Sequence, residues 1–241
     1  MTTSSSIRPF RVTRNETVAH GTAMLTLEPA DGVPMFPFLA GQFVMLRVNT
    51  PEETTIRRSY SVASAPSASA TSFEVAVKEA GETSRRIVGS KVGDVLGAQG
   101  PFGKFTLDVF DAPVVFVGGG IGITPLRSMV LELADRAFPR ETTLFYSCRG
   151  REDMAFEKEL RSLASEHPSF RFVPVVTREA LEGWDGETGH VDAEMVKRHV
   201  SDPAACRFYA CGPKDLVDGV KTVAEELGVD PASSFRQEIF G

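Results

Sequence analysis

The chain has 241 residues, of which 42% are hydrophobic and 24% are charged, and its formal net charge is -6 at pH 7. This composition is that of an ordinary globular protein, and it excludes disordered and collagen-like chains. The negative net charge and the lack of any basic run give no electrostatic reason to expect nucleic-acid binding.

The first part of the chain, up to about Leu107, has the pattern of an all-β domain. Its apolar residues form short, often alternating stretches, and glycine and proline separate these stretches from one another. Short strands with turn residues between them are typical of an antiparallel sandwich or barrel. One helical stretch interrupts them, at residues 84–88. The strand-like stretches are 24–27, 43–48, 73–77 and 95–96.

The pattern changes after Asp111, where strands and helices begin to alternate. This alternation predicts a parallel sheet covered by helices. We therefore place a domain boundary between residues 110 and 111, which gives domains 1–110 and 111–241. The predicted strands are 113–117, 142–147, 171–177 and 207–210, and the predicted helices are 125–137, 155–166, 192–199 and 213–227.

The three cysteines, Cys148, Cys206 and Cys211, are too few and too scattered for a disulfide scaffold, which favours a reducing compartment. They are also too few for a plant-type iron–sulfur cluster, which needs four cysteine ligands. The four histidines show no zinc spacing, so we expect no metal site. No signal peptide and no apolar run of membrane-spanning length is evident, so we expect a soluble, cytoplasmic protein.

The strongest local motif is the segment 118–125, Gly-Gly-Gly-Ile-Gly-Ile-Thr-Pro, between a predicted buried strand and a predicted helix. Glycines let the backbone approach a phosphate closely, and a helix N-terminus offers free N–H groups to a pyrophosphate. Pro125 suits the first turn of that helix. A tight turn without a ligand is the alternative, but the strand–loop–helix setting favours a dinucleotide site.

Proline stands here where the G-x-G-x-x-G pattern has its last glycine, so the segment resembles the nucleotide loop of the ferredoxin–NADP reductase superfamily. Other motifs of that family follow in the correct order over nearly the whole chain. The resemblance implies a six-stranded antiparallel Greek-key barrel that binds FAD, followed by a parallel-sheet NAD(P)-binding domain, without an iron–sulfur domain. The matching segments are Arg-Ser-Tyr-Ser at 58–61, Gly-Glu-Thr-Ser at 81–84, Gly-Pro-Phe-Gly at 100–103, Cys-Gly-Pro at 211–213 and Glu-Ile-Phe at 238–240.

The family's flavin motif implies a role for three residues of the segment 58–61. Arg58 would offer a planar pair of donors to the flavin phosphate, whereas an isolated arginine is more often part of a surface ion pair. Tyr60 would stack on the isoalloxazine ring, which contributes about 1 kcal/mol beyond burial. Ser61 would place its hydroxyl near flavin N5; the alternative is a strand serine that bonds to backbone.

The resemblance also implies roles for residues beyond this segment. Segment 81–84 is either an ordinary helix N-cap or a pyrophosphate cradle, and Arg85 and Arg86 follow it. Cys211 would lie against the nicotinamide rather than act as a nucleophile. Glu238 would be a proton or polarity partner close to the flavin, and Phe240 a cover for its ring.

The candidate catalytic residues are therefore Ser61, Cys211 and Glu238. The candidate cofactor-binding residues are Arg58, Ser59, Tyr60, Ser61, Val77, Gly81, Thr83, Ser84, Gly120, Gly122, Thr124, Pro125, Arg149, Thr177, Arg178, Cys211, Gly212 and Phe240.

The choice between the two nicotinamide cofactors depends on a few charged residues. Thr177-Arg178 is similar to the Ser-Arg pair that holds the 2′-phosphate of NADP in many relatives. Asp192 would repel a phosphate if it lay close, and Arg149 and Arg151 would compensate. We expect NADPH in preference to NADH.

The resemblance implies an FAD-dependent NAD(P)H oxidoreductase that exchanges electrons with a separate redox protein, such as ferredoxin, flavodoxin or an oxygenase component. Two alternatives stay open. One is an NAD(P)H:flavin reductase that releases reduced flavin, although the match at 81–84 argues against it. The other is an electron-transfer subunit of a larger redox complex.

Overall fold

The computed structural model describes residues 6–49, 55–108, 111–178 and 182–240. These residues pack as two compact units. The first unit comprises the chain up to Leu107 together with Arg127–Glu132, and the second comprises Asp108–Leu126 and the chain from Leu133 onward. Each unit contains one sheet.

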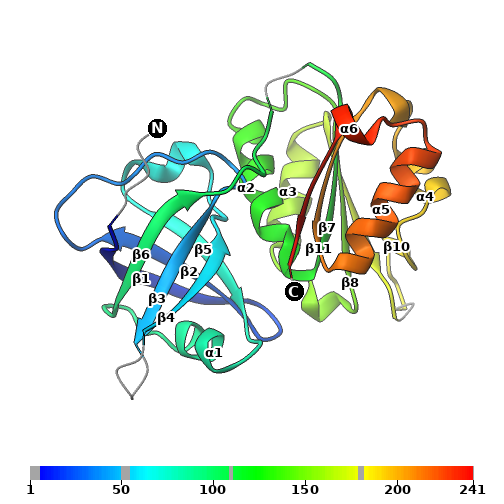
Figure 1. Ribbon diagram of the computed structural model, residues 1–241. Helices are drawn as coiled ribbons and strands as arrows, with labels where there is room; N and C mark the ends of the chain where they lie inside the picture. The colour runs from blue at the N-terminus through cyan, green and yellow to red at the C-terminus, as the bar shows by residue number, and fades with distance from the viewer. Residues whose placement is uncertain (1–5, 50–54, 109–110, 179–181, 241) are drawn as a thin grey trace. The chain divides into compact units, whose positions relative to one another are not determined.

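The first unit is built on a six-stranded antiparallel sheet with the strand order β4-β3-β6-β1-β2-β5 (Figure 1). An isolated bridge between Val62 and Val75 links the chain just after β4 to β5, the strand at the other edge. The sheet therefore curves towards closure, as the predicted barrel requires. Its elements are β1 (Arg8–Ala19), β2 (Thr22–Pro29), β3 (Phe43–Asn49), β4 (Thr55–Ser61), η1 (Pro66–Ala70), β5 (Phe73–Lys78), α1 (Glu82–Val88) and β6 (Val95–Phe102).

Alternating side chains build the core of the first unit, because successive residues of a strand point to opposite faces. Phe10 and Phe73 are fully buried, and their rings meet edge to face with centroids 5.1 Å apart. Phe36, from the connection between β2 and β3, joins them at 5.8 Å from Phe10. This aromatic cluster fills the interior on which the strands pack.

The second unit is built on a six-stranded parallel sheet with the order β10-β9-β8-β7-β11-β12. Helices α4 and α5 cover one face of this sheet and α3 covers the other (Figure 1). Its elements are β7 (Val114–Gly119), η2 (Gly120–Gly122), α2 (Ile123–Ala134), β8 (Thr142–Cys148), η3 (Arg151–Asp153), α3 (Glu157–Glu166), β9 (Phe170–Val176), β10 (Glu187–Thr188), α4 (Ala193–His199), η4 (Pro203–Ala205), β11 (Arg207–Gly212), α5 (Lys214–Glu226), α6 (Pro231–Ser234) and β12 (Phe235–Ile239).

Strands β7 and β8 are buried along their whole length, as expected for central strands of a sheet with helices on both faces. On the α4–α5 side, Val115 and Phe208 of the sheet pack in one apolar cluster with Val196 and Val220 of these helices. The carboxyl ends of the parallel strands lie at one edge of this sheet, which is where ligands bind in open α/β folds.

The predicted fold class, an antiparallel barrel followed by a parallel sheet with helices, is confirmed. Most predicted elements differ from the observed ones by one to three residues at their ends; α2, for example, begins at Ile123 rather than at Pro125. The short elements β10, α6 and β12 were not predicted. Among the described residues, no helix combines the length and the apolar character needed to cross a membrane.

Candidate functional site

The predicted flavin segment 58–61 forms the end of β4. Tyr60 lies opposite Val44 of β3, and Arg58 lies opposite Leu46, so both side chains leave the same face of the sheet. Tyr60 is half-buried and packs against the core of the first unit. Burial raises the pKa of its phenol, and the nearby Arg58 opposes that shift. Arg58 is exposed and bonds only to the Arg57 carbonyl among described groups, which leaves donors for an anion.

Ser61, the last residue of β4, has a buried hydroxyl without a partner. The residue is 6% exposed, and its Oγ makes no hydrogen bond in the described part of the protein. An unsatisfied buried hydroxyl costs about 1–3 kcal/mol, so such a group calls for an explanation. A cofactor atom that accepts or donates at this place would supply the missing bond. This hydroxyl therefore fits a bound flavin better than the alternative of a strand serine bonded to backbone.

The second predicted flavin segment forms the turn into α1. Ser84 Oγ donates to the Gly81 carbonyl at 3.0 Å and accepts from the Ala80 N–H at 2.8 Å. The hydroxyl thus holds the turn together, which leaves the backbone of the segment and the half-buried Thr83 as the groups open to a ligand. An added Cβ at Gly81 would meet no atom within 4 Å, so this turn has open space beside it.

Two further candidates differ in placement within the first unit. Ser59 is exposed on β4, next to Arg58. Val77 is fully buried in the core and belongs to β5. The Val77 side chain is therefore not accessible at the surface, whereas that of Ser59 is.

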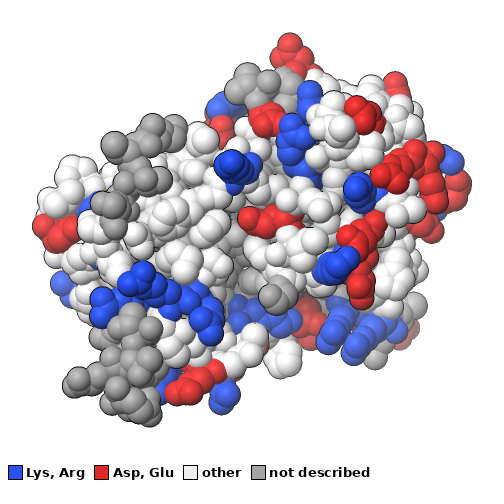
Figure 2. Space-filling view, viewed as in Figure 1, with Lys and Arg blue, Asp and Glu red and all other residues white. Residues whose placement is uncertain are grey.

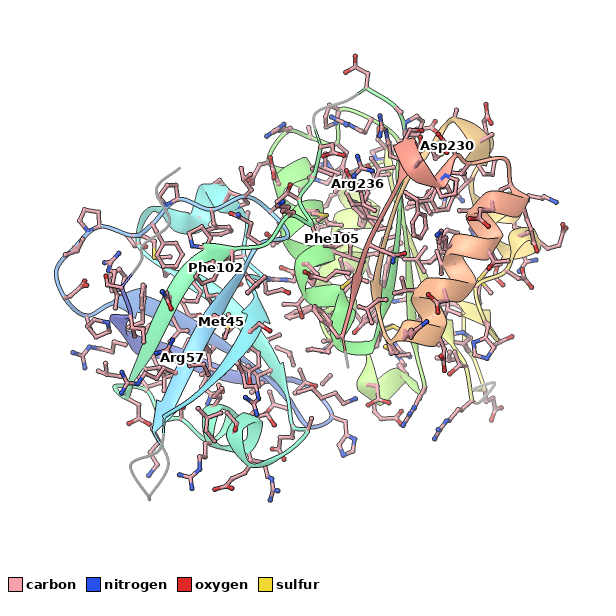
Figure 3. The ribbon with its side chains drawn as sticks, viewed as in Figure 1. Met45, Arg57, Phe102, Phe105, Asp230 and Arg236 are labelled. Atoms are coloured by element: carbon pink, nitrogen blue, oxygen red, sulfur yellow. The ribbon has the colours of Figure 1, made fainter. Side chains whose placement is uncertain are left out.

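Basic side chains gather on the face of the first unit that Figure 2 shows, over β3, β4 and α1. Arg57 and Arg58 of β4 and Arg85 of α1 are exposed. Arg57 lies directly opposite Arg47 across β3 and β4, and Figure 3 shows Arg57 close to Met45 of the neighbouring strand. Like charges directly opposite each other destabilise a sheet, so this arrangement is suited to an anionic ligand or partner.

The glycine loop of the second unit packs directly against the Cys211–Gly212 segment. An added Cβ at Gly122 would overlap the Cys211 carbonyl and lie 2.8 Å from Gly212 Cα, so no other residue fits there. Gly120 has a φ of 52° and open space around it. The loop therefore presents bare backbone at the end of β7, directly before helix α2, which is the geometry that a pyrophosphate requires.

The two residues that follow the loop have structural roles that the motif did not reveal. Thr124 Oγ1 donates to the Ile121 carbonyl at 2.6 Å, and the side chain is 2% exposed. Pro125 is buried in the first turn of α2, where its missing N–H costs nothing. Both residues shape the helix start, where the Ile123 N–H also donates to the Gly120 and Ile121 carbonyls.

Cys211 and Glu238 lie directly opposite each other on β11 and β12. Cys211 is fully buried; burial, and then the adjacent Glu238 carboxylate, raise the pKa of its thiol far above the usual value. Burial raises the pKa of Glu238 to about 7, and its Oε2 has no hydrogen-bond partner among the described residues. The raised pKa disfavours the thiolate form of Cys211, whereas Glu238 can hold or release a proton near neutral pH.

The end of the chain continues the pairing of β12 with β11. The Phe240 N–H donates to the Gly212 carbonyl at 3.0 Å, which brings this residue to the tip of the Cys-Gly-Pro segment. Arg236, labelled in Figure 3, lies four residues before Phe240 on β12, opposite Tyr209. Its Nε is 3.3 Å from Asp108 Oδ2, and the Tyr209 hydroxyl accepts a bond from the Asp108 N–H. β12 is therefore held as an edge strand.

The residues that are predicted to determine the preference for NADPH over NADH lie at the ends of β8 and β9. The Thr177 N–H donates to the Cys148 carbonyl at 2.9 Å, and the Arg178 N–H donates to the Arg149 carbonyl at 3.2 Å. Arg149 and Arg178 are both exposed on these adjacent segments. The structure therefore brings the two predicted guanidinium groups to neighbouring strand ends.

Two other charged residues from that prediction are occupied elsewhere. Arg151 pairs with Glu157 at 3.0 Å and lies over the Trp184 ring. Asp192 is the N-cap of α4, and its carboxylate accepts the Met195 N–H at 2.7 Å. Arg151 is thus less available to a phosphate than Arg149, and the negative charge of Asp192 is partly balanced by the helix start.

One group of buried polar residues was not predicted. Arg127 and Ser128 of α2 hydrogen-bond to the segment that follows Ser61, and Arg127 also pairs with Glu74. An arginine inside the apolar helix segment Pro-Leu-Arg-Ser-Met-Val-Leu is the signal that could have drawn attention to them. Within the described residues, no group of three or more His, Cys, Asp or Glu side chains gathers as a metal site would.

Comparison with known protein families assigns each half of the chain. Residues 9–107 match the family model of the oxidoreductase FAD-binding domain, and residues 116–222 match that of the oxidoreductase NAD-binding domain. These matches confirm the predicted pairing of an FAD-binding with an NAD-binding domain. The unpartnered Ser61 hydroxyl and the bare glycine loop show that the residues present fit these groups.

Two curated relatives and one solved structure illustrate the likeness. A flavohemoprotein from Bordetella pertussis is 32% identical over 97% of this chain, which spans 60% of that protein's length. The anthranilate 1,2-dioxygenase electron transfer component of Acinetobacter baylyi is 29% identical over 90% of the chain, which spans 63% of its length. The FAD/NAD-binding domain of a nitric oxide dioxygenase from Vibrio cholerae superposes with a TM-score of 0.88 at 24% identity, covering 97% of this chain and 98% of that one, and shows the fold alone.

The close packing at Gly122 leads to a first prediction. Gly122→Ala is expected to displace the loop from Cys211, lowering stability by about 1–3 kcal/mol and nicotinamide affinity on the order of tenfold. Gly219→Ala is the matched control, because its added Cβ lies in open space on helix α5 and should raise stability by about 0.5–1 kcal/mol. Thermal melting and fluorescence titration with the nicotinamide check both; equal affinity in the two variants would contradict the packing argument.

The raised pKa of Glu238 gives a second prediction. The folded protein keeps this proton up to about pH 7, whereas the unfolded chain loses it near the usual value of 4.5. Stability should therefore fall as pH rises through this window, relative to Glu238→Gln, which has no proton to lose. The measurement is the difference in melting temperature between wild type and Glu238→Gln from pH 4.5 to 8. A difference that does not change with pH would show that the Glu238 pKa is not raised.

Proposed function

We propose that this chain passes electrons between NAD(P)H and a separate redox protein through bound FAD. The reason is that the chain belongs to the ferredoxin–NADP reductase superfamily of FAD-binding and NAD-binding oxidoreductases. The observation that carries this proposal is the buried, unpartnered Ser61 hydroxyl at the end of the flavin segment, in a chain whose other unit presents a bare glycine loop. When bound, FAD accepts two electrons from the nicotinamide and can return them singly.

The first unit would bind and orient the flavin. Arg58 is exposed and offers its planar donors to the flavin phosphate. Tyr60 is held half-buried against the core, so its ring is a fixed surface on which an aromatic ring can stack. Ser61 presents a hydroxyl without another partner to the edge of the ring.

The second unit would bind the nicotinamide dinucleotide. Its glycine loop and the start of α2 offer backbone N–H groups to the pyrophosphate. Cys211 and Gly212 form a close-packed wall beside Gly122 for the nicotinamide end. Glu238 is partly buried and has a pKa raised to about 7, so it can bind or release a proton near neutral pH.

NADPH is the nicotinamide that the charged residues favour. Arg149 and Arg178 lie on adjacent strand ends and make no ion pair among the described residues, so both can meet a 2′-phosphate. Asp192 is engaged as a helix cap, which weakens the main argument against a phosphate at this place.

The acceptor would be an external redox protein, with an oxygenase component as the best candidate. The Acinetobacter relative is named as the electron transfer component of a dioxygenase.

We also propose the domain limits 1–110 and 111–241. A cytoplasmic location is supported by the three cysteines, which form no disulfide among the described residues.

Anaerobic titration tests the proposed function. The purified protein should carry a yellow flavin, and stoichiometric NADPH should bleach its visible absorption band. If the protein carried no flavin even after reconstitution with FAD, this result would contradict the proposal that the first unit binds FAD. A bound flavin that neither NADPH nor NADH bleaches would contradict electron transfer from the nicotinamide.

The choice of NADPH has its own test. Arg178→Ala should raise the KM for NADPH by about tenfold or more, because a charge-assisted hydrogen bond is lost, and should leave the KM for NADH unchanged. Arg149→Ala should act in the same direction. Arg171→Ala is the control, because it removes an exposed arginine near the opposite end of the same strand, β9. Equal shifts for both nucleotides would show that these arginines do not recognise the 2′-phosphate.

A further inference from the structure

The chain turns inward immediately after the flavin segment. Val62 and Ala63 are fully buried, and Ser64 is 5% exposed. Buried backbone carbonyls need hydrogen-bond partners, because water does not reach them. Val62 makes an isolated β bridge with Val75, and two further partners of this segment come from helix α2.

Arg127 and Ser128 supply donors to two of these carbonyls. Arg127 Nη1 donates to the Ala63 carbonyl at 2.9 Å, and Ser128 Oγ donates to the Ser64 carbonyl at 2.7 Å. Both donors are themselves buried: Arg127 is 6% exposed and Ser128 is fully buried. They belong to the segment Arg127–Glu132, which packs within the first unit.

Glu74 of β5 completes the network. Its carboxylate Oε2 accepts a second bond from Arg127 Nη1 at 2.8 Å. Its backbone accepts from the Ala63 N–H at 2.8 Å, and its own N–H donates to Ser64 Oγ at 3.1 Å. The turn at Ala63 and Ser64 is therefore held on one side by Glu74 and on the other by α2.

We propose that Arg127 and Ser128 are positioning residues for the flavin contact of Ser61. The Ser61 hydroxyl has no hydrogen-bond partner among the described residues, so no such bond fixes its direction. That backbone is paired with Phe43 on β3, and the residues directly after it are held by Arg127 and Ser128. This inference rests on the proposed function, because it assigns these residues a role toward the bound flavin.

Removal of the guanidinium should disturb the flavin as well as the fold. Arg127→Met leaves the Ala63 carbonyl and the Glu74 carboxylate without their donor. We expect kcat for NADPH-driven dye reduction to fall on the order of tenfold, because small misplacements of reacting groups are costly. The KM for NADPH should stay within about twofold, because no group proposed to bind the dinucleotide is changed. The visible circular dichroism of the bound flavin should change too.

The matched control is Arg14→Met. Arg14 pairs with Glu16 at 2.7 Å on β1 of the same unit, but both side chains are largely exposed. It should leave kcat, KM and the flavin spectrum unchanged, because an exposed pair contributes little. Ser128→Ala is the milder variant if Arg127→Met fails to fold; it removes one donor and should shift the flavin spectrum in the same direction.

A double variant separates positioning from stability. In Arg127→Met with Glu74→Met, no charge is left unpaired, so the melting temperature should recover most of its loss. The Ala63 carbonyl still lacks its donor, so the altered flavin spectrum and the lowered kcat should persist. If the double variant recovered the flavin spectrum and kcat together with the melting temperature, the proposal would be overturned. The Arg127–Glu74 ion pair would then have only a structural role.

The outcomes for wild type and variant distinguish the two levels of inference. A wild-type protein that binds no FAD, or whose flavin NADPH does not bleach, fails the proposed function. A wild-type protein that does both, with Arg127→Met and Ser128→Ala indistinguishable from Arg14→Met in spectrum and kcat, fails only the positioning role.

Discussion

The close approach of Gly122 to the Cys211 carbonyl is the constraint on which the nucleotide half of the protein depends. β7 and β11 are neighbours in the sheet, with Gly118 opposite Cys211, so the loop that leaves β7 must pass the end of β11. A side chain at position 122 would block that path. Because the contact is between backbones, the loop can begin helix α2 with its N–H groups unobstructed, and the Cys-Gly-Pro segment gains a fixed neighbour.

Buried polar groups without a hydrogen-bond partner occur in two of the segments that match cofactor motifs. Most buried polar groups in a native protein have partners, and this chain follows that rule even at difficult places such as Arg127 and Ser128. Ser61 Oγ and Glu238 Oε2 are exceptions among the described residues. Both belong to segments that match cofactor motifs in the sequence, and the proposed function would give each of them a partner in the bound cofactor.

The accuracy of the sequence predictions depended on how local the determining interactions are. The glycine loop and the Asp192 helix start follow from neighbours within a few residues, and both could be predicted in position. The Arg127–Glu74 pair joins residues that are 53 positions apart in the sequence, and no periodic pattern in the sequence predicts such a pair. The strand β12 is five residues long and mostly polar, so its place at the sheet edge comes from pairing with β11 rather than from its own pattern.

Local hydrogen bonding also limits what a motif can say about chemistry. Ser84 matches a phosphate-binding motif, yet its hydroxyl is used by the turn itself, as ordinary N-cap chemistry predicts. Arg151 was a candidate for the phosphate site, yet it is held by Glu157 and Trp184. What remains for a 2′-phosphate is Arg149 and Arg178, two exposed guanidinium groups at adjacent strand ends. The proposed preference for NADPH therefore rests on fewer charged residues than the sequence offers.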